Sequence, residues 1–476
     1  MLQTLKNAWN TKELRVKILF TLFILLLYRI GTVIPVPFVE ANKFSGTLFS
    51  GTILEQMDIL SGGSLGTFTV FALGVSPYIN ASIIIQLLAV VFPRLGELAK
   101  NDKEKMNFIT RIVTVVLAIV TAIGYYFLIR NNGLLVNAAD PAQNPGLSWL
   151  YGIVIIACYC AGAAVIMWLG ELINKKGIGN GISMILFANI VSTLPSFVYQ
   201  LVSLAIRTYS YTEKAWLYGI VSTAFALAVI LVLVALFIFV IWVTGSERRI
   251  PITYAKRVIG RKMYGGQSQN LPIKLNMTGV MPIIFASSIV SIIPTVITLC
   301  GVTETNDGFW AGALRVLGAD GVVYPVCLFL LIIAFAYFYT QITFDPVEVS
   351  NNIKKQGGAI PGIRQGRPTA DYIRKILNKV TLVGAIFLGI VAVLPVVSGP
   401  HIFQHIIEWI FRGDSLVFGE YIIMDNTITT IPQAASSITS HLTFGGTSIL
   451  IIVGVVIETF RGLESELTMR NYKGFL

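Results

Sequence analysis

Ten apolar stretches, and the side on which positive charge gathers between them, constrain this chain more than any other feature. Each stretch is about 20 residues long, which at about 1.5 Å per residue crosses a hydrocarbon core about 30 Å thick. With the intervening segments numbered alternately from the N-terminus, one side holds 28 of the 35 Lys and Arg residues when Lys17 and Arg111, near the ends of their stretches, are counted with it. The other side holds six, and Arg29 lies within the first stretch. The stretches are 16–34, 74–92, 109–129, 149–170, 182–206, 217–243, 278–299, 323–344, 380–397 and 443–460.

Lys and Arg collect on the cytoplasmic side of membrane proteins, so this asymmetry predicts both the class of the protein and its orientation. The composition agrees, because 55% of the residues are hydrophobic and 12% are charged, against about 25% charged in soluble domains. The runs are continuously apolar, whereas the strands of a membrane barrel alternate. We therefore expect an all-α, multi-pass membrane protein with ten spans and both termini in the cytoplasm. No cleavage site follows the first apolar run, so a cleaved signal peptide is not expected.

The ten spans divide into two sets of five, in the segments 1–210 and 211–476. Because five is odd, the second set crosses the membrane in the opposite sense to the first, which is the arrangement of inverted repeats. The two segments share no convincing sequence identity, so the repeat is inferred from topology alone. A secondary transporter with inverted repeats is therefore one functional hypothesis.

The segment 60–72 lies on the outer side, directly before the second span, and is too short to cross the membrane. It is weakly apolar, contains three glycines, and no charge occurs between Asp58 and Arg94. Irregular backbone at membrane depth is tolerated only where protein or water surrounds it. The segment therefore predicts a re-entrant half-helix inside a funnel. An interfacial loop helix is the alternative.

Two cytoplasmic segments, 245–277 and 345–379, are several times longer than the usual 2–8 residues between neighbouring helices. In the first, residues alternate around 250–254 and 271–275 with two glycines between, which predicts a β-hairpin projecting from the membrane. In the second, glycine and proline pairs predict either an ordered turn region or a mobile loop. The length of both segments indicates a docking site for a partner.

No formally charged residue lies at the centre of any span. Coupled transporters generally carry a charged side chain near mid-membrane, but here Arg29, Glu171, Asp345 and Glu458 lie at span ends. This pattern disfavours the transporter hypothesis. The absence of charge predicts a path lined by aliphatic side chains. Such a path excludes ions by dewetting and makes no specific polar contact with a substrate.

Sequence motifs of enzymes are also absent. The segment 177–181 is glycine-rich but lacks the preceding strand and the Lys-Ser/Thr of a phosphate-binding loop. We interpret it as a turn that opens a helix, with Asn180 or Ser183 near the cap. No His-Glu-x-x-His motif and no Ser/His/Asp set occurs at a plausible spacing. We therefore expect no enzyme activity, catalytic residue, metal or cofactor.

Several motifs resemble the SecY family, the channel subunits of the bacterial Sec protein translocase. They follow one another in the family's order over about residues 16 to 470. They are LSGG at 60–63, FALGVSPYINASIIIQLL at 71–88, WLGELINKKGIGNGIS at 168–183, TYAKR at 253–257, QSQNLPIKLNMTGVMPIIFASSI at 267–289, PGIRQGRPTADYI at 361–373 and FGGTSILIIVGVVIETF at 444–460.

The resemblance implies two five-helix halves clamped around an hourglass pore through which unfolded preproteins cross the plasma membrane. It implies that 60–72 is a plug that closes the outer funnel. Its plug residues are Ser61, Gly62, Gly63, Ser64, Leu65, Gly66, Thr67 and Phe68. The aliphatic ring implied at the waist of the pore consists of Val75, Ile79, Ile182, Leu186, Ile284 and Ile451.

The resemblance further implies a lateral gate, through which signal sequences and membrane helices leave sideways into lipid. The gate would lie between the second and third spans on one side and the seventh and eighth on the other. The implied partners are SecE, and with it SecG in a SecYEG complex, the SecA motor and the ribosome. Basic side chains on the two long loops would dock the motor or the ribosome: Arg248, Arg249, Lys256, Arg257, Lys354, Lys355 and Arg364, the last within the PGIR motif.

One segment departs from the family pattern. Residues 398–442, before the last span, form an outer loop far longer than the usual short connection. It is either an amphipathic surface helix or an insertion, and we assign it no function.

Overall fold

The computed structural model describes residues 2–40, 53–136, 148–210, 215–254, 257–259, 262–264, 268–299, 302, 308–318, 321, 323–412, 421–424, 427–430 and 446–473. Long helices dominate this part of the chain, in agreement with the predicted all-α membrane fold. Every predicted apolar stretch falls on a helix. These are α2 (Lys12–Gly31), α4 (Ser76–Val91), α6 (Lys103–Asn131), α7 (Ser148–Lys176), α8 (Gly181–Ser210), α9 (Ala215–Gly245), α10 (Met281–Leu299), α12 (Val323–Thr343), α14 (Arg367–Arg412) and α16 (Gly446–Lys473).

Eight of the described helices are long and apolar enough to cross a membrane by themselves. The pair α4 and α5 (Pro93–Asn101), bent by 118° at Phe92, raises the number to nine if it is counted as one span. The remaining predicted stretch, 16–34, lies on α2, which has charged residues near both ends. The length and composition of the helices thus support eight or nine spans, and the count of ten depends on including α2.

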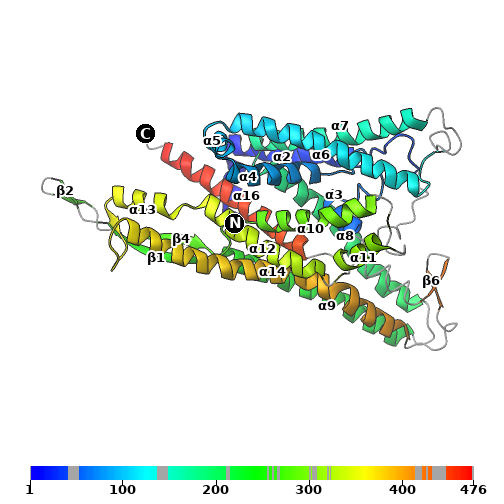
Figure 1. Cartoon of the computed structure of the whole chain (residues 1–476). Coiled ribbons are helices and arrows are strands. Elements are labelled where there is room, and N and C mark those ends of the chain that lie inside the picture. The colour runs from blue at the N-terminus through cyan, green and yellow to red at the C-terminus, as the bar shows by residue number, and fades with distance from the viewer. Residues whose placement is uncertain are drawn as a thin grey trace.

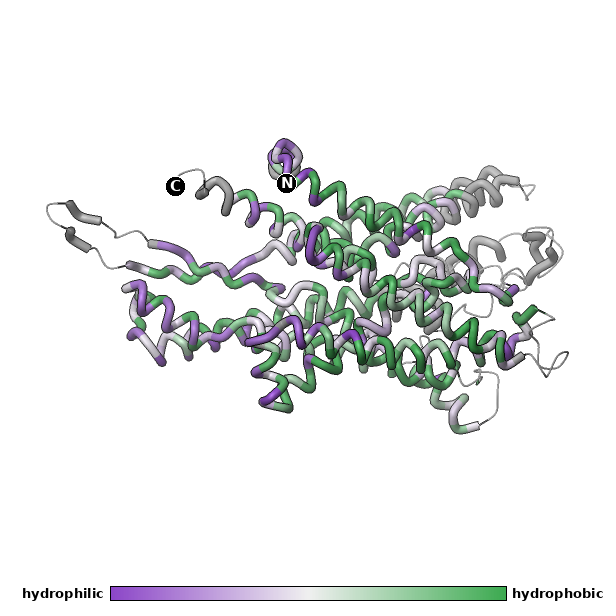
Figure 2. Tube along the Cα trace, turned by 90° about the horizontal axis from the view of Figure 1, so that it is seen from above, coloured by the Kyte–Doolittle hydropathy of each residue, from purple (hydrophilic) through white to green (hydrophobic). Residues whose placement is uncertain are grey.

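Among the described residues, five shorter helices lie between or before the long ones: α1 (Leu2–Asn10), α3 (Ile53–Ser61), α5, α11 (Phe309–Leu317) and α13 (Pro346–Lys355). Figure 1 shows the long helices packed side by side, with the strands β1 and β4 and the helix α13 at one end of the bundle and α3 and α11 toward the other. Figure 2 shows hydrophobic residues along the middle of the bundle and hydrophilic residues gathered at the end that carries α13. This polarity is that of a membrane-embedded body with one large aqueous domain.

The predicted β-hairpin in 245–277 is confirmed. Strand β1 (Glu247–Tyr254) pairs antiparallel with β4 (Ser268–Lys274), and the short strands β2 (Arg257–Ile259) and β3 (Lys262–Tyr264) continue the hairpin toward its tip. Ile250 and Ile252 alternate with exposed neighbours along β1, which gives one buried and one solvated face.

The second long segment is ordered rather than mobile. It contains α13, then β5 (Gly358–Ala359), which pairs with the end of β1, and then the start of α14. The resulting sheet has the order β4-β1-β5. One apolar cluster lies beneath it: Ile250, Ile252, Ile273, Ile353, Ile360, Ile373 and Leu377. The two long segments therefore form one small folded unit, which their separate sequence patterns did not reveal.

Two predicted boundaries are wrong. No helix spans 60–72, because α3 ends at Ser61 and the chain from Gly62 onward runs through turns with positive φ at Gly62 and Gly63. The ninth span was expected to stop at 397, but α14 continues to Arg412. Beyond it the described part of the long outer segment is a hairpin of β6 (Tyr421–Met424) and β7 (Thr427–Thr430).

Candidate functional site

The six predicted ring residues lie in one hydrophobic cluster. Val75 is the residue before α4, Ile79 is on its first turn, Ile182 and Leu186 are on the first turns of α8, Ile284 is on α10 and Ile451 is on α16. All six belong to the same set of packed, buried side chains, and none is more than 9% exposed. The structure therefore brings together residues that are separated by up to 376 positions in the chain. The elements that carry them come from both segments, 1–210 and 211–476.

The start of α8 is positioned by backbone contact with α7. A Cβ on Gly181 would lie 2.0 Å from the carbonyl oxygen of Gly170, so only glycine fits there. The side chain of Asn180 accepts a hydrogen bond from the N–H of Ile182, at 3.2 Å, as an N-cap does. The glycine-rich segment is thus a turn that opens a helix, as predicted, and it fixes Ile182 and Leu186 against α7.

The charged residues at the span ends are not members of this cluster. Glu171 on α7 forms an ion pair with Arg111 on α6, and Asp345 accepts a hydrogen bond from the N–H of Val347, at 2.8 Å, where it caps α13. Glu458 is exposed on α16. The members of the cluster are aliphatic and aromatic, with no Asp, Glu, Lys, Arg or His among them.

The predicted plug residues pack beside the ring cluster. Leu65 and Phe68 are almost completely buried, in a second apolar cluster that includes residues of α6 and α7. Within the segment, the carboxylate of Asp58 accepts hydrogen bonds from the N–H groups of Leu65 and Gly66, at 3.0 and 2.9 Å. The chain is thereby folded into a compact turn after α3, although only Ser61 of the predicted plug residues is helical.

Helix α3 itself packs against α8 and α10. The amide of Asn189, on α8, donates a hydrogen bond to the carbonyl oxygen of Leu60, at 2.8 Å. Sequence reasoning missed Asn189. The available signal was a fully polar side chain within an apolar span, which is costly in a membrane and marks a functional position.

The four helices predicted to flank a lateral gate lie next to one another. Helix α10 packs against α4, α6 and α12. On α12, the hydroxyl of Tyr339 donates a hydrogen bond to Oε1 of Gln86 on α4, and its ring centroid lies 5.0 Å from that of Phe285 on α10. Gln86 and Tyr339 were not singled out from the sequence, although Gln86 is another polar residue inside an apolar span.

The predicted docking residues that the structure describes fall on the folded unit formed by 245–277 and 345–379. Arg248 and Arg249 are exposed on β1, and Arg249 lies 2.8 Å from the carboxylate of Glu247. The other exposed members are at the end of α13 and in the loop before α14: Lys354, Lys355 and Arg364. Lys256 lies outside the described residues, and Arg257 is described only as part of β2.

Two more cations, Lys274 on β4 and Arg461 on α16, lie close enough to affect each other. Burial lowers the pKa of Lys274 on β4, the nearby Arg461 of α16 lowers it further, and Glu247 opposes the shift. Two cations held close together disfavour each other's charge.

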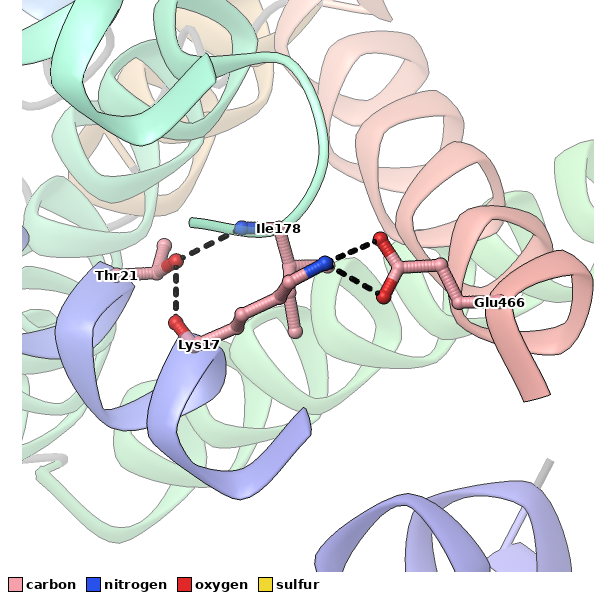
Figure 3. Close-up of polar contacts among 4 residues, drawn as sticks. All are labelled: Lys17, Thr21, Ile178 and Glu466. Atoms are coloured by element: carbon pink, nitrogen blue, oxygen red, sulfur yellow. Dashed lines mark hydrogen bonds and ion pairs between the residues drawn. The ribbon is translucent and has the colours of Figure 1, made fainter. Parts of the chain in front are cut away.

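The N-terminal and C-terminal segments meet at a polar junction, shown in Figure 3. Nζ of Lys17 on α2 donates to both carboxylate oxygens of Glu466 on α16, at 2.8 and 2.9 Å. One turn further along α2, the hydroxyl of Thr21 accepts a hydrogen bond from the N–H of Ile178, at 3.1 Å. The junction therefore ties the first and last long helices to the turn before α8.

Comparisons with known proteins agree with this geometry. The model of the SecY family matches residues 69–460. The chain is 40% identical over 487 residues to the protein translocase subunit SecY of Streptomyces galbus and 39% identical over 491 residues to that of Mycobacterium tuberculosis (strain ATCC 25618 / H37Rv), in each case over 100% of both chains.

Solved structures show the same fold. One described as the structure of a protein conducting channel has a TM-score of 0.60 at 18% identity, with 95% of this chain and 92% of that chain covered. A second has a TM-score of 0.59 at the same coverage, and its title states that the plug domain of the SecY protein stabilises the closed state of the translocation channel and maintains a membrane seal. This chain belongs to the SecY family of protein translocase subunits.

Proposed function

We propose that this chain is the pore-forming subunit of a protein-conducting channel, which moves unfolded preproteins across the plasma membrane and releases membrane helices sideways into lipid. The observation that carries the proposal is the cluster of six aliphatic ring residues, buried together and contributed by elements of both segments of the chain. A cluster without formal charge offers no specific polar contact. It therefore suits a substrate whose side chains change at every step.

The ring acts as a gasket. Its residues are Val, Ile and Leu, whose individual van der Waals contacts are weak, about 0.1–0.2 kcal/mol per atom pair. The ring can therefore part and close again as side chains pass, and when closed it excludes ions because a narrow apolar constriction sheds water. The segment 61–68 is the plug that seals the outer side of the resting channel.

The gate between α4 and α6 on one side and α10 and α12 on the other opens toward lipid. An apolar segment that leaves through it gains about 25 cal/mol for each Å² of apolar surface removed from water. The partition of the segment into lipid therefore needs no energy source in this chain. Transport energy comes from a partner, and the chain itself hydrolyses nothing.

The partners are SecE, SecG, the SecA motor and the ribosome. The exposed cations of the folded unit formed by 245–277 and 345–379 support this assignment, because such groups bind ribosomal RNA phosphates or an acidic protein surface. Two of the solved structures with this fold are described as Sec61 in a canine ribosome-channel complex and a yeast Ssh1 complex bound to a ribosome. This unit faces the cytoplasm, together with both termini.

The test is ion conductance in planar bilayers. Ile79→Asn and Ile284→Asn each place an amide in the ring and are expected to hydrate the constriction and raise the resting conductance. A matched control is Ile230→Asn, because Ile230 on α9 is 39% exposed on the outside of the bundle. Unchanged conductance in both ring variants, or an equal rise in the control, would overturn the ring assignment. The alternative function, a secondary transporter, needs a charged residue near mid-membrane, and the cluster contains none.

A further inference from the structure

The C-terminus of α3 is closed by a turn that needs two glycines. The N–H of Gly62 bonds to the carbonyl of Ile59, at 3.1 Å, and the N–H of Gly63 bonds to the carbonyl of Asp58, at 2.9 Å. Gly62 and Gly63 have φ of +73° and +84°. This is the Schellman arrangement of a helix C-terminus, in which the residue after the helix adopts the left-handed conformation that glycine tolerates best.

Two further carbonyls of the last turn remain to be satisfied. The carbonyl of Ser61 accepts a hydrogen bond from the hydroxyl of Ser64, at 2.9 Å, within the plug itself. The carbonyl of Leu60 accepts from the amide of Asn189, at 2.8 Å. The cap of α3 is therefore completed from a different helix, α8.

Arg29 of α2 approaches the same turn. A Cβ added to Gly62 would lie 2.8 Å from Nη1 of Arg29 and 2.9 Å from Oδ1 of Asn189, so both polar atoms face the backbone of Gly62. Both atoms are buried and form no hydrogen bond within the described structure, and Asn189 is completely buried. A cation at a helix C-terminus is stabilised by the partial negative charge of the terminal carbonyls.

Asn189 also shares a helix face with two ring residues. On α8, Ile182, Leu186 and Asn189 are separated by four and three positions, so their side chains lie one above another. The apolar part of this face lines the ring cluster, and its polar end holds α3. A movement of α8 that displaces Ile182 and Leu186 would therefore also displace the donor to Leu60.

We propose that Asn189 and Arg29 form a latch for the plug, and that α8 couples release of the latch to dilation of the ring. The inference rests on the proposed function, because it assigns the residues that position the plug in the closed channel. Removal of the Asn189 amide leaves the carbonyl of Leu60 without its donor in the closed state, which is expected to shift the equilibrium about tenfold. Removal of the latch is thus expected to favour the open plug without the arrival of a substrate.

The experiment measures resting conductance in planar bilayers and the labelling of Ser64→Cys by a membrane-impermeant maleimide, in a background without the native cysteines. Asn189→Ala removes the donor to Leu60. Gly62→Ala places a Cβ against Arg29 and Asn189 and strains a residue with positive φ. The control Asn276→Ala removes another buried asparagine, one that lies outside the plug and whose Oδ1 also lacks a partner in the described structure. A variant lacking residues 62–67 reports conductance without the plug.

The latch predicts that Asn189→Ala and Gly62→Ala each raise conductance, and maleimide labelling of the thiol introduced by Ser64→Cys, about tenfold. Asn276→Ala raises neither, at equal melting temperatures. A rise in the plug-deleted variant without any rise in Asn189→Ala and Gly62→Ala would overturn the latch and leave the proposed function intact. Unchanged conductance in the plug-deleted variant would instead overturn the sealing role of the plug, and with it the latch.

Discussion

Tyr339 on α12 and Gln86 on α4 are joined by a hydrogen bond from the tyrosine hydroxyl to the glutamine Oε1. Gln86 lies in the segment 1–210 and Tyr339 in the segment 211–476, so the bond bridges the proposed lateral gate. Nε2 of Gln86 is also engaged, at 3.0 Å from the hydroxyl of Ser82 on the same helix. Gln86 is thereby oriented toward α12.

Tyr339→Phe is expected to weaken the closed gate. Hydrogen bonds between helices in membranes contribute about 0.6 kcal/mol on average, which corresponds to about a threefold shift toward the open gate. The measurement is the fraction of marginally hydrophobic segments that insert into lipid in reconstituted vesicles, which should rise. The control is Tyr337→Phe, because the hydroxyl of Tyr337 donates to the carbonyl of Asn378 on α14 instead. An equal effect of both variants would argue against a gate-specific role.

The polar junction in Figure 3 allows two interactions of different strength to be compared. Lys17 and Glu466 are each about one-third exposed, and ion pairs of this kind contribute about 0.2–1 kcal/mol. Thr21 is 3% exposed, and its loss would leave the buried N–H of Ile178 without its acceptor, at a cost of about 1–3 kcal/mol. We predict that Thr21→Val lowers the thermal unfolding midpoint in detergent more than Lys17→Ala does. The reverse order would show that the ion pair dominates the junction.

Arg364→Glu is expected to block transport that depends on the motor or the ribosome while the fold is kept. Arg364 is exposed in the loop before α14, where its side chain is free to meet phosphates or carboxylates on a partner. The measurement is translocation of a preprotein into proteoliposomes, with size-exclusion chromatography as the check on folding. Arg15→Glu, at an exposed position on α2, is the control for charge alone. Normal translocation by Arg364→Glu would contradict the docking role.

Much of the fold could be predicted from the sequence because membrane spans and hairpins follow simple periodic patterns. Apolar runs placed the ten long helices, and alternation around Ile250 and Ile273 predicted the strands β1 and β4. Tertiary contacts between distant segments have no such local signal. The pairing of β5 with β1, at Thr253 and Ala359, joins residues about a hundred positions apart, so it could not be predicted from either segment.

The candidate site was predictable only in part. The absence of charge from the spans indicated an aliphatic path, but the six ring positions came from resemblance to a family and not from periodicity. The helix expected over 60–72 was misplaced, because two adjacent glycines with positive φ end α3 at Ser61. Asn189 was not predicted as a site residue, because the sequence alone does not show which group a single polar residue in a long apolar span will contact. In the folded chain that group is the carbonyl of Leu60.

The central claim is that unfolded polypeptide passes through the waist formed by the aliphatic ring. It is tested most directly by disulfide trapping between Ile284→Cys and a single cysteine in a preprotein stalled during translocation, in a background without the native cysteines. Leu231→Cys, on the exposed face of α9, is the control. The account predicts a strong cross-link at position 284 that appears only during translocation, with none at 231. Equal cross-linking at both positions, or none at 284, would contradict it.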